Sequence, residues 1–89
     1  MTYRVEETDD ALGVLIALPS DAVISYLEMR AALELDPWTG DPYRPDNPKA
    51  DNSRVMAFAS GCGMAHYVII EHLQDPDRRV VIASVLWAG

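Results

Sequence analysis

The sequence lacks several features that would assign it to a class of protein. Its single cysteine, Cys62, cannot form an internal disulfide, which predicts a cytoplasmic protein. No apolar run approaches the roughly 18 residues that a membrane-spanning helix needs, and the first residues lack the pattern of a signal peptide. The 49% hydrophobic content argues against disorder. A length of 89 residues predicts one domain, residues 1–89.

Basic residues are also scarce: seven lysines and arginines face fourteen acidic residues, for a net charge of −7. The imbalance lies in residues 1–53, which carry eleven acids and four bases, whereas residues 54–89 are balanced. An acidic domain repels phosphate backbones at long range. RNA or a ribosome is therefore a disfavoured partner, although a local basic spot on the second half remains open.

The first half predicts one strand and two helices. Residues 2–7 alternate apolar and polar side chains, as in a strand, and Thr8 or the acids after it can cap a helix that ends before Pro19. Ser20 can cap a second helix, which ends at Asp36-Pro37. We expect the buried face of this helix to be its apolar stripe at i, i+3, i+7 and i+11, formed by Ile24, Leu27, Ala31 and Leu35.

The second half predicts a β-sheet. Residues 36–53 hold four of the six prolines, so they should form turns and extended pieces, with Trp38 and Tyr43 either covering the core or serving a binding loop. Strands are expected at 54–59, 64–73 and 79–87, with a hairpin turn at Ser60-Gly61-Cys62-Gly63. The order β-α-α-β-β-β predicts an α+β domain with one antiparallel sheet and both helices on one face.

Two histidines are the first candidates for chemistry. His66 and His72 fall on one predicted strand, about 20 Å apart, which is too far for both to act on one phosphate. His66 could serve alone as a general acid or base, and a structural histidine is the alternative. Cys62 and His66 do not supply the three or four ligands that zinc needs, so we expect no metal site and no cofactor.

Candidate binding residues lie in the second half. Arg54, Arg78 and Arg79 are its only cations, and they would contact any phosphate or acidic peptide; ordinary solvated strand ends are the alternative. Met56 and Trp87 would line a partner surface if one face of the sheet is left uncovered, and core packing is their alternative.

The pattern as a whole resembles the RelE/ParE superfamily, the toxins of bacterial type II toxin–antitoxin modules. The resemblance covers the opening strand, the helical pair around Leu18-Pro19, Arg54 at the hairpin entrance, the Tyr67-Val68-Ile69 strand and the final strand. The stretch Leu35-Asp36-Pro37-Trp38 and the residues after it look like small actinobacterial proteins of this kind.

The resemblance implies a toxin-like component whose inhibition of growth is blocked by a protein antitoxin. A non-catalytic interaction domain on the same scaffold, binding a partner or a second copy of itself, is the alternative. Family members act by ribosome-dependent mRNA cleavage or by gyrase inhibition. Here the arginine usual in the middle hairpin strand is replaced by Met64-Ala65-His66, and the basic C-terminal tail is missing. These departures argue against ribonuclease activity.

Overall fold

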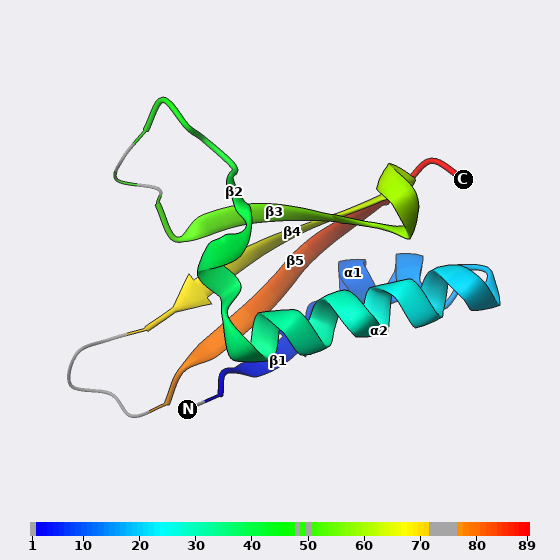
Figure 1. The fold of residues 1–89 in the computed structure, drawn as a ribbon, viewed down its shortest axis with the longest axis horizontal. Helices are drawn as coiled ribbons and strands as arrows, with labels where there is room; N and C mark the ends of the chain where they lie inside the picture. The colour runs from blue at the N-terminus through cyan, green and yellow to red at the C-terminus, as the bar shows by residue number, and fades with distance from the viewer. Residues whose placement is uncertain (1, 48, 50, 72–76) are drawn as a thin grey trace.

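The computed structural model describes residues 2–47, 49, 51–71 and 77–89, which form a twisted sheet with two helices packed against it (Figure 1). In chain order the elements are β1 (Arg4–Glu7), α1 (Asp9–Leu15), α2 (Ser20–Leu35), the 3-10 helix η1 (Pro37–Thr39), β2 (Asp41–Pro42), β3 (Ser53–Phe58), the 3-10 helix η3 (Ala59–Gly61), β4 (Gly63–Ile70) and β5 (Arg79–Trp87). Within the described residues, no helix has the length and hydropathy needed to cross a membrane.

The sheet has the strand order β1-β5-β4-β3-β2. The predicted α+β architecture, with two helices on one face, is confirmed. Three of the four strand pairs are antiparallel, but β1 runs parallel to β5, so the sheet is mixed. The parallel direction of β1 could not be predicted from the sequence. Alternation of side chains identifies the buried face of a strand, but it does not show which strand pairs with it or in which direction.

Segment boundaries differ from the expectation at two places. The stretch expected to be irregular contains η1 and β2, and β2 adds a fifth strand by pairing with Val55 and Arg54. Two residues, one of them a proline, are too few to show a strand period. The strand expected at 64–73 ends at Ile70, and the turn expected after it falls largely on 72–76, outside the described residues.

The N-cap residues of the two helices differ in whether their side chains accept a hydrogen bond. Thr8, one of the three residues predicted as possible caps, caps α1, because its Oγ1 accepts a hydrogen bond from the Ala11 backbone N–H at 3.2 Å. Ser20 is instead the first residue of α2, and the N-cap position belongs to Pro19, which offers no side-chain acceptor.

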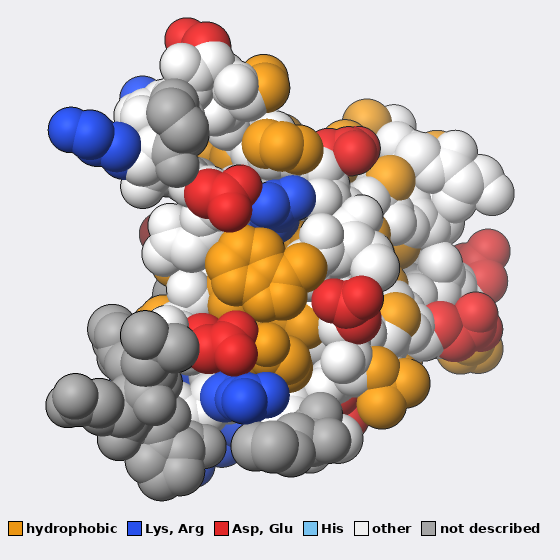
Figure 2. Space-filling model, turned by 60° about the vertical axis from the view of Figure 1, so that its left-hand side comes forward, with side chains coloured by type: hydrophobic (Ala, Val, Ile, Leu, Met, Phe, Trp, Pro, Cys, Tyr) orange, Lys and Arg blue, Asp and Glu red, His pale blue; other side chains and the backbone are white. Residues whose placement is uncertain are grey.

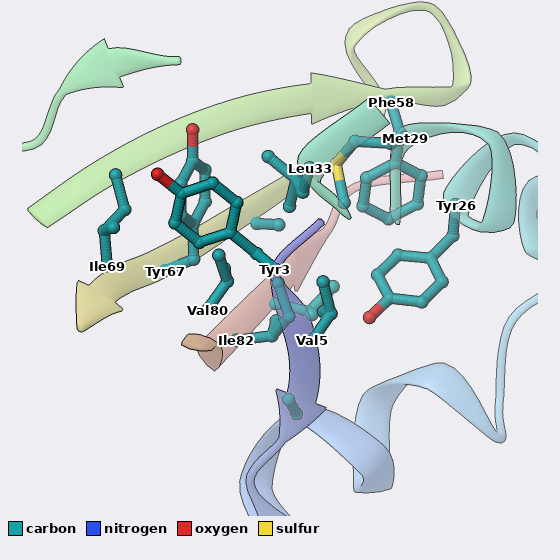
Figure 3. Close-up of a cluster of buried hydrophobic side chains, with 13 residues drawn as sticks. Tyr3, Val5, Tyr26, Met29, Leu33, Phe58, Tyr67, Ile69, Val80 and Ile82 are labelled. Atoms are coloured by element: carbon teal, nitrogen blue, oxygen red, sulfur yellow. The ribbon is translucent and has the colours of Figure 1, made fainter. Parts of the chain in front are cut away.

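One core lies between the helices and the sheet. Tyr67, Ile69, Val80 and Ile82 point from β4 and β5 toward Tyr26, Met29 and Leu33 on α2 (Figure 3). Ala11 of α1 joins the same cluster, which places both helices on one face. Apolar contact of this kind is the main stabilisation of a small domain.

The expected inner face of α2 is wrong. Ile24, Leu27 and Leu35 are 59%, 53% and 71% exposed, and Ala31 is exposed as well. The residues that face the sheet are Ala22, Tyr26, Met29 and Leu33.

Polar contacts to β1 explain why α2 turns the side with Tyr26, Met29 and Leu33 toward the sheet. The Tyr26 hydroxyl and the Arg30 Nε both donate to Glu7 Oε2 at 2.7 Å, and Arg30 Nη2 donates to the Val5 carbonyl at 2.6 Å. Burial and the hydrogen bond to Glu7 raise the pKa of Tyr26, while the hydrogen bond to Glu7 raises the pKa of Arg30. Turning the Ile24 side inward would separate these groups and leave Glu7 without its partners.

The segment after α2 is attached to the sheet by Tyr67. Its buried hydroxyl donates to the Pro37 carbonyl at 2.6 Å, and burial raises the pKa of Tyr67 to about 12. Gly40 lies against the same hydroxyl, so a Cβ there would overlap Tyr67 Oη and stand 2.9 Å from the Val55 carbonyl oxygen. A close approach of this kind requires glycine.

We therefore expect Gly40→Ala to lower the free energy of unfolding by about 1–3 kcal/mol through overpacking. Gly13→Ala is the matched control, since a Cβ at this helical position meets nothing within 4 Å. This control should stabilise the protein by roughly 0.5–1 kcal/mol. Urea unfolding of both variants measures the difference, and equal midpoints would contradict the crowding at Gly40.

Candidate functional site

The face of the sheet opposite the helices carries the first candidate site. Side chains of β4 alternate, so His66 and its neighbours two residues away, Met64 and Val68, project to this face. On this face, Met64 of β4 is 37% exposed and Leu86 of β5 is 71% exposed. The result is an apolar surface with one histidine within it.

His66 is held by one residue of another strand, Ser53 of β3, and by Tyr43, which follows β2 in a loop. The Ser53 Oγ lies 2.7 Å from His66 Nε2, and the Tyr43 ring lies over the imidazole with centroids 3.9 Å apart. Desolvation by burial lowers the pKa of His66. A neutral imidazole beside a hydroxyl can accept a proton, which is the behaviour of a general base.

The second candidate site surrounds Trp38 on η1. Figure 2 brings the side of the molecule that carries η1 forward and shows hydrophobic side chains in its middle, with acidic and basic side chains around them. The Arg54 guanidinium stands 5.3 Å from the centroid of the Trp38 ring, and Arg78 lies 5.9 Å from that of Tyr3. The structure therefore brings the predicted residues Arg54 and Arg78 to one face, together with two aromatic rings.

Both arginines already have acidic or carbonyl partners. Arg54 Nη2 bonds Asp51 Oδ1 at 2.7 Å and Nη1 bonds the Gly40 carbonyl at 3.0 Å, and its side chain is only 13% exposed. Arg78 Nε lies 3.5 Å from Glu71 Oε1. The charge predicted to receive a phosphate is thus largely balanced within the domain.

Glu71 links the parts of this second site. Its Oε2 accepts from the Tyr3 hydroxyl at 2.6 Å and from Trp38 Nε1 at 3.3 Å. The hydrogen bond from Tyr3 lowers the pKa of Glu71, while burial raises the pKa of Tyr3. An ionised carboxylate at the centre of the site opposes the approach of an anion.

The sheet separates the predicted catalytic residue from the predicted cations. In the β3–β4 register Arg54 pairs with Tyr67, which faces the core, whereas His66 pairs with Val55 on the opposite face. Arg79 shares the face of His66 but pairs with Ile70, four residues along β4, which is about 13 Å away. The structure assembles no cluster of His66 with these arginines.

Met56 and Trp87 lie on the helix-covered face. Met56 packs against the core, and Trp87 stacks on Phe58 with ring centroids 6.2 Å apart. Trp87 also borders an open pocket of about 420 Å³ that Cys62 and Asp21 help to line. The uncovered face presents Met64 and Leu86 in their place.

Sequence reasoning missed Ser53 and Glu71 as site residues. Their roles depend on cross-strand and loop contacts that no local spacing reveals. Trp38 and Tyr43 are 38% and 48% exposed, so they do not serve as core cover. Among the described residues, no group of three or more histidine, cysteine or acidic side chains could hold a metal ion; His72 is outside this set.

Comparison with known proteins decides the fold. No family model matches the sequence, and no curated protein matches it either. A solved chain of the archaeal RelE–RelB complex from Pyrococcus horikoshii OT3 superposes with a TM-score of 0.66 and 21% identity, covering 100% of this chain and 98% of that one. The chain has a RelE-like fold. The identity is low, so the RelE-like likeness concerns architecture.

Titration of His66 tests the first site. We expect an NMR pKa below 6.5, because burial penalises the imidazolium. Since the unfolded chain then binds the proton more readily, stability is full above about pH 6.5 and falls as the pH decreases through the lowered value.

His66→Gln identifies the resonance and should remove this part of the pH dependence. A His66 pKa at or above 6.5 would contradict the burial of the ring beneath Tyr43.

Proposed function

We propose that this protein is the toxin-like component of a type II toxin–antitoxin module, acting in the cytoplasm and neutralised by a protein antitoxin. The RelE-like fold across the whole chain carries the proposal. The similar solved chain comes from a complex of RelE with RelB, which supports a protein partner here.

We further propose that inhibition occurs through binding a cellular protein and that RNA is not cleaved. Phosphodiester cleavage needs a proton-transfer group and phosphate-binding cations around one phosphate. His66 and Arg54 lie on opposite faces of the sheet, and the Asp51 and Glu71 carboxylates neutralise Arg54 and Arg78.

A non-catalytic interaction domain on the same scaffold is the second candidate. The uncovered sheet face favours it, because Met64 and Leu86 expose apolar surface beside the half-buried Val68. Such surface can bind a partner protein or a second copy of the chain. This candidate differs from the first in predicting no effect on growth.

Induced expression in a bacterial host tests the proposal. We expect growth arrest, relieved by co-expression of an antitoxin encoded beside the gene, and we expect His66→Ala to arrest growth as strongly as the wild type. Normal growth at a confirmed level of folded protein would favour the interaction domain. Cleavage of RNA, with or without ribosomes, that is abolished by His66→Ala would refute the non-catalytic mechanism.

RNA binding provides a separate measurement. We expect weak binding even at low salt, because the net charge is −7 and both Arg54 and Arg78 are paired with carboxylates within the domain. The double variant Arg78→Ala/Arg79→Ala should therefore change little. Tight binding whose salt slope falls by roughly one unit for each arginine removed would restore a nucleic-acid role.

A further inference from the structure

The outer side of α2 displays an apolar row, the α2 stripe, formed by Ile24, Leu27, Ala31 and Leu35. Its three large side chains are between 53% and 71% exposed. The opposite side of the helix is occupied by the core residues Ala22, Tyr26, Met29 and Leu33. A helix that is apolar on two opposite sides normally has neighbours on both. Among the residues that the structure describes, α2 has a neighbour on only one of these sides.

The spacing of the α2 stripe fits a second helix. Ile24, Leu27 and Ala31 repeat at the three- and four-residue intervals by which a helix presents a seam to another helix. From Ile24 to Leu35 the row extends about 16 Å, or three turns. This length suits an amphipathic helix lying along α2.

Charges beside the stripe define the partner further. Asp21 and Glu28 are exposed on one flank, and Glu34, with a 41% exposed side chain, lies on the other. Arg30 is the only basic residue of α2, and its guanidinium bonds Glu7, Glu34 and the Val5 carbonyl. The flanks of the stripe are therefore acidic, and a complementary helix would carry lysine or arginine beside its apolar seam.

We propose that the α2 stripe is the docking site of an amphipathic helix with basic flanks, contributed by the antitoxin. The identity of the partner rests on the proposed function. Two copies of this chain would set Glu28 and Asp21 against the same acids of the other copy if they packed stripe to stripe. Charge thus favours a basic partner over self-association.

A designed peptide tests the docking chemistry with purified full-length protein. The probe is a fluorescent helical peptide of about three heptads, with leucine at the seam and lysine at the flanking positions. A second peptide keeps the seam and carries glutamate at the flanks. We expect the lysine peptide to bind at least about tenfold more tightly, with weakening at higher salt.

Variants locate the site. Leu27→Gln and Ile24→Gln should each weaken binding of the lysine peptide about tenfold or more, because they remove apolar contacts at the seam. Glu28→Lys should reduce the preference for the lysine peptide. The matched controls are Ile16→Gln, which changes an 84% exposed residue outside α2, and Leu86→Thr on the uncovered sheet face. Both controls should bind as the wild type does.

Each other outcome overturns the docking proposal. Loss of binding in Leu86→Thr but not in Leu27→Gln would assign docking to the sheet face. A dimer in sedimentation analysis that Leu27→Gln dissociates would assign the stripe to a second copy. Equal binding of both peptides, or of neither, would remove the role of the acidic flanks. Because no growth is measured, failure of docking is distinguishable from failure of the proposed toxicity.

Discussion

The Glu7 carboxylate, which accepts hydrogen bonds from both Tyr26 and Arg30, is the contact on which the orientation of α2 depends. Both donors come from one side of the helix and reach the same oxygen of a strand residue. Charge-assisted hydrogen bonds in a partly buried place are costly to lose, so this contact selects one rotation of the helix. That rotation directs Tyr26, Met29 and Leu33 into the core and leaves the α2 stripe outside.

The division of the sheet into two faces has an equally direct effect on function. Neighbouring residues on a strand point to opposite faces, so His66 and Tyr67, although adjacent, belong to different environments. Tyr67 reaches into the core to Pro37, whereas His66 meets Ser53 and Tyr43 outside. Arg54 follows Tyr67 to the core face, where Asp51 and Trp38 hold it. A RelE-like scaffold can therefore keep its shape while the histidine and the arginine considered as site residues are held on opposite faces of the sheet.

The sequence identified individual candidate residues, but it did not show how they are arranged or which residues contact them. Arg54 and Arg78 were identified because they are among the few cations of the second half, and they do share a face. The sequence did not show that Asp51 and Glu71 neutralise these arginines. Glu71 is seven residues from Arg78, and it is bonded to Tyr3, which is 68 residues away in the sequence. His66 was found by residue type, while Ser53 came into contact with it through the pairing of β3 with β4.

By itself, the sequence determined the α+β composition, a helix start at Thr8 or the acids after it, the three main strands of the second half and the acidic charge. These properties depend on residues close together in the chain, whose spacing and chemistry act locally. Tertiary structure alone decided the parallel pairing of β1 with β5 and the inward face of α2. A helix with apolar residues on two sides can bury either one, and the choice here lies with Glu7, thirteen residues before the helix begins, through its contacts with Tyr26 and Arg30.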